Sequence, residues 1–323
     1  MKLLVTGATA PLGMAIVTRL LADPEVELVL AVGREPEACW QDPRVVYRAV
    51  DLSRSREVHD LLCGAARDHA IDTVVHAAQH RDAHGGGHRV HAQNVESTRA
   101  LVLGCANHPT IRRFVYRSFA EVYAQHDTPT SLIAEDAPLE FDPTVSQWLR
   151  DRVEADLTVC SHHDRSLQIV VLRCAEIFAP GTGSQLWDYV SSHVCLRPAG
   201  FDPILNLLAI EDAATAFATA ARSTAIGVFN IPGADTLPLS RTISESNRAD
   251  VPLPGLLMAP LYKLRRALSG FDFRYDLNVR RFHFGGVLDG SRARRELGYT
   301  PQTHVHWPRP WWRVLFERLV EAR

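Results

Sequence analysis

A glycine-containing turn near the start of the chain joins an apolar run to a helical stretch. The run Leu3-Leu4-Val5 is typical of a buried strand, and the turn from Thr6 to Gly13 follows it at once. Pro11 is favoured in the first turn of a helix, and apolar residues recur after it with helical spacing. A strand that passes through a tight turn into a helix predicts the first unit of an α/β fold.

The same alternation continues along the first half of the chain. The expected further strands are 28–32, 45–47, 73–78, 114–116 and 168–172, and the expected helices are 56–68, 94–105 and 145–160. Continuous apolar strands separated by helices indicate a parallel sheet covered on both faces, a doubly wound α/β domain of the Rossmann type. Prolines interrupt the pattern afterwards. We therefore expect one domain over 1–174 and a smaller, mixed lobe over 175–323, with some of its segments returning to the sheet.

Composition excludes several classes of protein. The 323 residues are 46% hydrophobic and 22% charged, which is ordinary for a globular chain, and the net charge of −2 gives no electrostatic reason to bind nucleic acid. Six cysteines form no C-x-x-C pair, which favours a reducing compartment. No apolar run approaches the ~20 residues of a transmembrane segment. With no room for a signal peptide before the first strand, we expect a cytoplasmic protein.

The turn after the first strand has the arrangement of a dinucleotide-binding loop, in which backbone N–H groups and the helix dipole hold a pyrophosphate. Gly7 supplies the turn, and Gly13 allows the helix to pack close to the strand. The middle position is Ala10, whose methyl group faces the expected phosphate. The predicted cofactor-binding residues of this loop are Gly7, Thr9, Ala10, Pro11, Leu12 and Gly13. The alternative is a packing turn that binds nothing.

Residues after the second and third strands bear on the choice of cofactor. Where NAD is bound, an acidic residue normally closes the second strand and accepts a hydrogen bond from the ribose 2′-OH. Here that strand ends in Gly33-Arg34, and a guanidinium can pair with a 2′-phosphate, so NADP is favoured over NAD. A solvated arginine is the alternative. Asp51, followed by Leu52, is placed to accept from an adenine amine.

Segments along nearly the whole chain resemble the extended short-chain dehydrogenase/reductases, the NAD-dependent epimerase/dehydratase family. These segments are 6–13, 51–52, 74–78, 94–98, 114–123, 172–181, 210–213 and 289–299. The resemblance implies an NAD(P) cofactor also held by Ala77, Ala78, Asn94 and Arg152, and a small-molecule ligand in a pocket with Glu121 and Glu176. It also implies a homodimer through the helices at 94–105 and 145–160, although the apolar residues of those helices could equally be core.

The resemblance assigns the family's active site to three positions, and each is replaced in this chain. The family's Ser or Thr corresponds to Phe119, its proton-transferring Tyr to Trp148, and its Lys to Arg152. Tryptophan is a hydrogen-bond donor only and phenylalanine has no polar atom, so neither supplies a general acid or base near neutral pH. Arg152 still offers charge and donors to a ribose.

These replacements leave alternative functions open. The leading hypothesis is an NAD(P)-binding protein without the usual Tyr/Lys-dependent chemistry, with a binding, sensing or scaffold role. The second is an active NADP-dependent reductase or epimerase, acting on a nucleotide sugar or a lipid-like carbonyl compound, with a relocated proton donor such as Ser118 or Tyr123. In a third, the fold serves assembly alone and the cofactor is lost.

Two further segments carry weaker signals. Histidines at 76, 80, 84, 88 and 91 suggest a metal site, but the glycines at 85–87 make a continuous helix through them unfavourable. We expect no metal, with His76 on a strand and the others in a polar loop beside the cofactor cleft. The segment 307–320 is predicted to be an amphipathic helix that packs on its own domain or a partner, or lies on a membrane.

Overall fold

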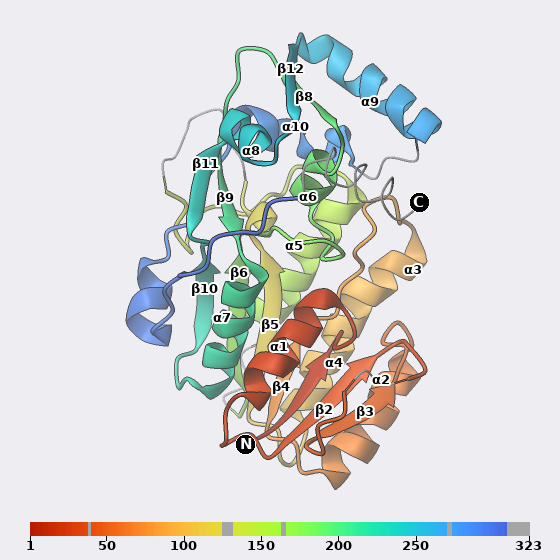
Figure 1. The fold of residues 1–323 in the computed structure, drawn as a ribbon. Helices are drawn as coiled ribbons and strands as arrows, with labels where there is room; N and C mark the ends of the chain where they lie inside the picture. Colours follow the sequence, from red (N-terminus) through yellow and green to blue (C-terminus); the bar gives the residue numbers. More distant parts are fainter. Residues whose placement is uncertain (38–39, 125–131, 163–165, 270–272, 309–323) are drawn as a thin grey trace, which may run out of the picture.

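The central element of the fold is a parallel sheet of seven strands in the order β10-β6-β5-β4-β1-β2-β3 (Figure 1). The computed structural model describes residues 1–37, 40–124, 132–162, 166–269 and 273–308. The strands are β1 (Lys2–Thr6), β2 (Leu28–Gly33), β3 (Val45–Ala49), β4 (Thr73–His76), β5 (Arg113–Phe119), β6 (Gln168–Cys174) and β10 (Gly227–Ile231). Every pairing among them is parallel. The predicted doubly wound α/β fold of the Rossmann type is confirmed.

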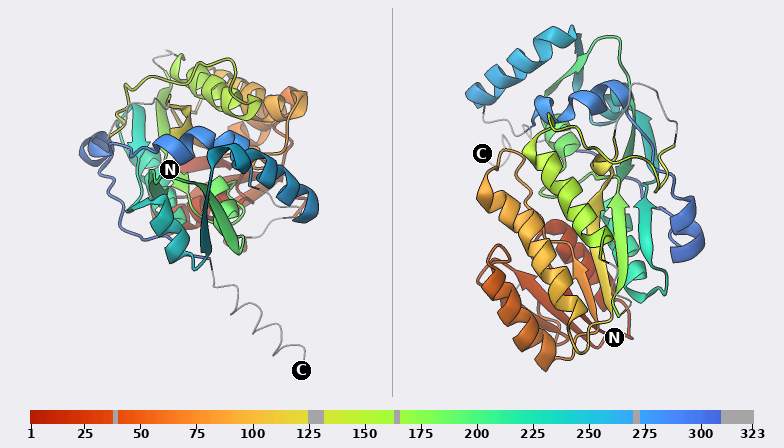
Figure 2. Two further views of the ribbon diagram at one scale, coloured as in Figure 1. Left: turned by 90° about the horizontal axis from the view of Figure 1, so that it is seen from above. Right: turned by 180° about the vertical axis from the view of Figure 1, so that it is seen from behind.

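Helices cover both faces of this sheet. Helices α1 (Pro11–Leu21) and α7 (Ile210–Arg222) pack together on one face, and α2 (Ser55–Leu61), α4 (Ser97–Ala106) and α5 (Gln147–Cys160) cover the other (Figure 2). Successive residues of β1 face opposite sides, so Leu3 and Val5 enter the core under α1 and α7 while Leu4 enters the core under α2 and α4. This explains why strands such as β1 and β2 have continuous apolar runs rather than an alternating pattern.

The second half of the chain forms a smaller lobe beyond the carboxyl ends of these strands (Figure 1). Its sheets are β11-β9-β7 and the pair β12-β8, built from β7 (Glu176–Ile177), β8 (Val194–Pro198), β9 (Ile204–Leu208), β11 (Asp235–Pro238) and β12 (Ala249–Leu253). Its helices are α6 (Gln185–Val190), α8 (Leu239–Glu245), α9 (Gly255–Ser269) and α10 (Tyr275–Phe284). Between these segments the chain returns to the first layer, because α7 packs on α1 and β10 forms the edge of the main sheet.

Two glycines of the turn after β1 lie where a side chain would collide with backbone. Gly7 has a φ of +67°, and a Cβ on it would lie 2.8 Å from the Cα of Ala78. A Cβ on Gly13 would lie 2.0 Å from the carbonyl oxygen of Gly7. The turn, the first helix and the segment after β4 therefore approach one another as closely as backbones allow, as the sequence predicted for Gly7 and Gly13.

One expectation about the histidines is wrong. We expected His88 and His91 in a loop, but they belong to the short helix α3 (His88–His91), which leads through a π-helical turn into α4. Gly87, with a φ of +80°, ends the preceding loop and caps the new helix. The three glycines therefore mark where the loop stops rather than excluding a helix after it.

Two absences hold for the part of the chain that the structure describes. Within it, His, Cys, Asp and Glu side chains form no group of three or more that could hold a metal ion. No helix among the described residues has the length and apolar character needed to cross a bilayer. The predicted amphipathic segment 307–320 lies outside the described residues from position 309 onward.

His76, at the end of β4, is buried between two threonines. Thr6 Oγ1 lies 2.7 Å from Nδ1 of the ring, and Thr98 Oγ1 lies 3.0 Å from Nε2. The Thr98 hydroxyl already donates to the carbonyl of Asn94 at 2.6 Å, so it accepts from Nε2–H. Burial lowers the pKa of His76 to about 3. The neutral ring, on β4, thus connects β1 and α4 through its contacts with the hydroxyls of Thr6 and Thr98.

His76 makes stability depend on pH. The unfolded chain takes up a proton on this ring below about pH 6.5, whereas the folded chain does not until about pH 3. We expect this group to remove about 1.4 kcal/mol of stability per pH unit as the pH falls below 6.5, or about 2 kcal/mol by pH 5. Urea denaturation from pH 7 to 5 should show this slope reduced in His76→Gln and unchanged in the exposed control His59→Gln. Equal slopes in all three proteins would contradict the assignment.

Candidate functional site

A cavity of about 750 Å³ lies at the carboxyl ends of the central strands. The chain order reverses at β1, which has β2 on one side and β4 on the other, and ligands of open α/β sheets bind in the crevice at such a switch point. Its walls are the loops after β1, β2, β3 and β4, together with the segment Gly181–Gly183 of the C-terminal lobe. The predicted cofactor residues on these walls are Gly7, Thr9, Ala10, Leu12, Arg34, Asp51, Leu52, Ala77 and Ala78. We call this cavity the cleft.

Four other predicted cofactor residues lie off the cleft walls in the described part of the chain. Pro11 begins α1, and Gly13 packs beneath the turn. Asn94 is buried, and its Oδ1 accepts a hydrogen bond of 2.8 Å from the backbone N–H of His80, which fixes the loop after β4. Arg152 turns away from the cleft toward aromatic rings.

The outer end of the cleft, beside β2 and β3, carries charges of both signs. Arg34 and Asp51 lie on its wall as the sequence indicated, and the carboxylate of Asp51 accepts a bond of 2.7 Å from Ser53 Oγ. Sequence reasoning missed Glu35. Its carboxylate accepts hydrogen bonds from Thr9 Oγ1 and from the Arg34 backbone N–H, and the bond from Thr9 lowers the pKa of Glu35. Its place directly after Arg34 was the available signal.

The loop between β4 and α3 covers the cleft and is tied to the C-terminal lobe. Arg81 Nη1 donates to the carbonyl of Gly181 at 2.8 Å, and Arg274 Nη1 donates to the carbonyl of Ala83 at 2.9 Å. These bonds connect segments roughly a hundred or more residues apart in the sequence. They lie toward the inner end of the cleft, which we define as the end beside β4, β5 and the segment Gly181–Gly183.

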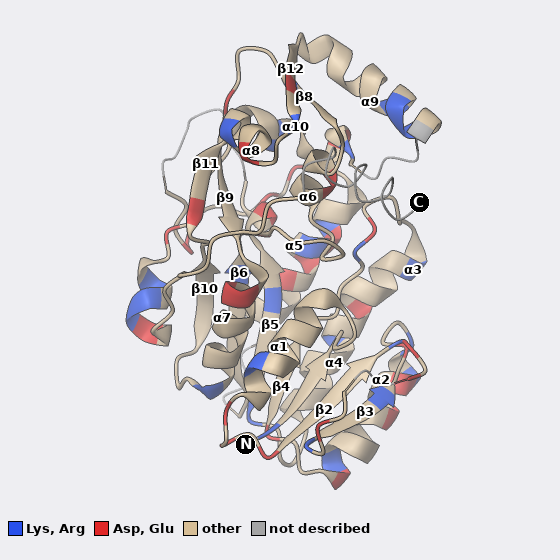
Figure 3. Ribbon diagram, in the orientation of Figure 1, with Lys and Arg blue, Asp and Glu red and all other residues tan. Residues whose placement is uncertain are grey.

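The three positions assigned to the family's active site come together beside this inner end. The guanidinium carbon of Arg152 lies 3.3 Å from the ring centroid of Trp148 and 3.7 Å from that of Phe119. All three side chains are buried, with 7–8% of their surface exposed. Trp148 and Arg152 lie one turn apart on α5, which carries charged residues of both signs at the centre of the molecule (Figure 3). We call these three residues the aromatic–guanidinium stack.

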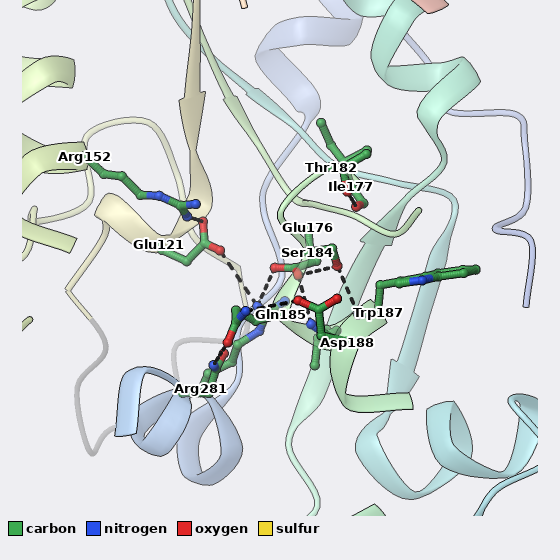
Figure 4. A network of polar contacts seen from close by, with 12 residues as sticks. Glu121, Arg152, Glu176, Ile177, Thr182, Ser184, Gln185, Trp187, Asp188 and Arg281 are labelled. Carbon is green, nitrogen blue, oxygen red and sulfur yellow. Dashed lines mark hydrogen bonds and ion pairs between the residues drawn. The ribbon is translucent and has the colours of Figure 1, made fainter. Parts of the chain in front are cut away.

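A chain of buried ion pairs extends from the stack into the C-terminal lobe (Figure 4). Arg152 Nη1 lies 3.3 Å from Glu121 Oε2, and Arg281 Nη1 lies 3.8 Å from Glu121 Oε1 and 2.5 Å from Glu176 Oε2. Glu176 Oε1 also accepts from Ser184 Oγ at 2.5 Å. Burial by itself would raise the pKa of Glu176, but the charge of Arg281 and these hydrogen bonds outweigh it and hold that pKa well below its usual value. Both predicted substrate-pocket residues, Glu121 and Glu176, belong to this network.

The two side chains considered as substitute proton donors are engaged in the core. Ser118 Oγ donates to the carboxylate of Asp156, which also forms a two-pronged ion pair with Arg173. Tyr123 Oη donates to Asn230 Oδ1 at 2.6 Å, and burial raises the pKa of Tyr123 to about 12. Such a pKa is far from the range in which a general acid or base works at neutral pH.

A second cavity, of about 240 Å³, lies between the start of α5 and α10. Glu121, Tyr123, Trp148 and Arg281 are on its wall. In the described chain, the residues lining this cavity and those lining the cleft do not overlap. The aromatic–guanidinium stack contacts both groups of lining residues. Trp148 itself lines the second cavity. Arg117 lines the cleft, and its guanidinium faces the ring of Phe119.

The parallel sheet and the cleft beside its glycine turn define an α/β protein of the Rossmann type. A model of the NAD dependent epimerase/dehydratase family matches residues 3–231, so the chain belongs to that family and the resemblance is confirmed. Uncharacterized proteins of Mycobacterium tuberculosis and Mycobacterium bovis are 29% identical to it over 306 residues, covering 93% of this chain and 80% of theirs.

Solved structures share the fold at low sequence identity. One is the dTDP-glucose 4,6-dehydratase of Bacillus anthracis in complex with NAD, with a TM-score of 0.69, 15% identity, and coverage of 94% of this chain and 92% of that one. Another is the UDP-glucuronic acid 4-epimerase of Bacillus cereus in complex with UDP-glucuronic acid and NAD, with a TM-score of 0.70, 16% identity, and coverage of 94% and 95%.

The aromatic–guanidinium stack should contribute measurably to stability. Arg152→Leu removes a buried cation from two aromatic faces and from Glu121, and we expect a loss of about 3 kcal/mol in the free energy of unfolding. Arg152→Lys keeps the charge without the planar stacking surface and should lose less. The control is Arg150→Leu, an exposed position on the same helix, where a change below about 1 kcal/mol is expected. Urea denaturation measures all three, and equal losses at positions 150 and 152 would contradict the prediction.

Proposed function

We propose that this protein binds a dinucleotide in the cleft and does not carry out the Tyr/Lys-dependent chemistry of its family, acting instead as a binding, sensing or scaffold protein. The dinucleotide lies against the domain of residues 1–174, and a small-molecule ligand lies against the lobe of residues 175–323. The observation that carries the proposal is the buried aromatic–guanidinium stack of Phe119, Trp148 and Arg152.

Proton transfer is the step that this stack cannot perform. An indole N–H and a phenyl ring have no pKa near neutrality, and the pKa of Arg152, lowered by burial, is still about 10. The stack also stands between the cleft and the second cavity. Hydride transfer needs the two reacting carbons in contact, at about 3–3.5 Å, and a packed stack between nicotinamide and ligand prevents this.

Two experiments test the absence of this chemistry. Purified protein is incubated with NADPH, or with NADP⁺, and a panel of nucleotide sugars and carbonyl compounds, the substrate classes of the competing reductase or epimerase hypothesis. We expect no change in nicotinamide absorbance and no sugar epimer above the background without protein. Turnover that disappears in Glu121→Gln, whose carboxylate lies on the wall of the second cavity, would support the active enzyme instead.

For the cofactor we propose NADP rather than NAD, held at its 2′-phosphate by Arg34 on the outer wall of the cleft. Arg34 has a guanidinium suited to a phosphate, and it follows β2 at the place where NAD-binding chains carry an acid. The carboxylate of Glu35 accepts hydrogen bonds from the Thr9 hydroxyl and the Arg34 backbone N–H. Among the described residues, no hydrogen bond joins that carboxylate to the Arg34 guanidinium. The third hypothesis, a fold without cofactor, predicts that no dinucleotide binds.

Arg34→Met should weaken NADPH binding about tenfold and leave NADH binding within about twofold, because only NADPH carries the 2′-phosphate. Arg48→Met is the matched control, since Arg48 is exposed on β3 and lies off the cleft wall. Isothermal titration calorimetry measures the affinities. Equal weakening for both cofactors, or tighter binding of NADH than NADPH by the unaltered protein, would overturn the choice of NADP.

We also propose a cytoplasmic homodimer formed through α4 and α5, as the resemblance implies. The two helices pack side by side on one face, and Leu103 of α4 and Leu157 of α5 are exposed there, by 48% and 36%. Apolar side chains exposed together on neighbouring helices are suited to burial against a second copy.

The double substitution Leu103→Glu and Leu157→Glu should convert a dimer into a monomer, because carboxylates would be buried at the interface. Analytical ultracentrifugation measures the mass of each protein. The control is Leu256→Glu and Leu268→Glu on α9, two leucines that are 92% and 78% exposed on a different helix. A monomeric unaltered protein would contradict the proposal, and so would a double variant that stays dimeric.

A further inference from the structure

One buried arginine at the inner end of the cleft has no carboxylate within ion-pair distance among the described residues. Arg117, on β5, is 6% exposed and lies on the cleft wall together with Thr182 and Gln185. Its Nη2 has a long contact of 3.5 Å to the Thr182 carbonyl, and its buried Nε has no hydrogen-bond partner among the described residues. The described residues also give it no ion pair. Burial without such a partner lowers the pKa of Arg117.

The carboxylates around Arg117 are committed elsewhere. Glu121 faces Arg152 and Arg281, and Glu176 faces Arg281 and Ser184. Asp188, across the cleft, accepts from Gln185 Nε2 at 3.2 Å. Arg152 and Arg281 therefore each have a carboxylate within ion-pair distance, whereas Arg117 has none among the described residues. Burying an unpaired cation costs several kcal/mol, which a bound anion would offset.

We propose that the inner end of the cleft is an anion-binding subsite centred on Arg117, which takes a phosphate or carboxylate group. Arg117 lines the cavity with its Nε–H lacking a partner among the described residues, and charge-assisted bonds to phosphate or carboxylate oxygens are the strong bonds that a guanidinium forms. Its placement at the inner end of a dinucleotide cleft rests on the proposed function. The anion belongs either to the distal part of the nucleotide ligand or to a second, small ligand beside it.

Calorimetric titration with inorganic phosphate and with malonate, at constant ionic strength in chloride, tests the subsite. The unaltered protein should bind at least one of the two probes, and Arg117→Met should weaken that binding at least about tenfold. Arg117→Lys, which keeps the charge, should retain part of it. The control is Arg48→Met, which removes an exposed arginine that lies off the cleft wall and should change the affinity less than about twofold. Failure of the unaltered protein to bind either probe, or equal binding by Arg117→Met, overturns the subsite.

Thermal unfolding gives a second readout. In chloride alone, Arg117→Met should melt at or above the temperature of the unaltered protein, because an uncompensated buried charge has been removed. Phosphate should raise the melting temperature of the unaltered protein and not that of the variant. A large destabilisation by Arg117→Met in chloride, with the same phosphate response in both proteins, would show a structural arginine and overturn the proposal.

Repeating the titration with NADPH present separates the two sources of the anion. If phosphate binds equally well beside saturating NADPH, the anion belongs to a second ligand. If NADPH abolishes phosphate binding, the nucleotide ligand itself occupies the subsite. If phosphate binds through Arg117 but no dinucleotide binds at all, the proposed function fails while the anion subsite stands.

Discussion

The guanidinium of Arg152, held between the rings of Trp148 and Phe119, determines what the site can do. A guanidinium is planar and weakly hydrated, so it can offer both faces to aromatic rings and still direct its edge at a carboxylate. Here that carboxylate belongs to Glu121, which also pairs with Arg281, and Arg281 in turn pairs with Glu176. A single stack thus joins α5 to β5 and connects the two lobes through ion pairs.

The fold could be predicted from local features of the sequence. Six of the seven strands of the main sheet were visible as short apolar runs between helical stretches, whereas β10 was not predicted as a strand. The backbone contacts of Gly7 and Gly13 follow from the strand–turn–helix order, because only a residue without Cβ fits there. These signals lie within about ten residues of one another, which is why they predicted most of the sheet and nine of the 26 residues on the cleft wall. The extent of α3 was missed, since a glycine run ends one element and permits the next.

The charge pattern of the site could not be predicted in this way. Arg281 and Glu176 lie 105 residues apart in the sequence, and their pairing depends on how α10 packs on the C-terminal lobe. The replaced positions 119, 148 and 152 were found through the family resemblance, but that their side chains stack on one another requires coordinates. Arg117 carried no sequence signal at all, because a buried and an exposed arginine look alike in a chain with 35 basic residues.

A site built from arginine has a fixed charge. Only Lys2 and Lys263 are lysines in this sequence, and neither lies near the stack. A lysine has a lower pKa than an arginine to begin with, so the same desolvation would bring it nearer to neutral pH, whereas Arg152 keeps a pKa of about 10. Glu176 is held ionised by Arg281 over the same range. Groups that do not change protonation near pH 7 give a constant electrostatic field, which suits recognition of a charged ligand and is unsuited to general acid–base catalysis.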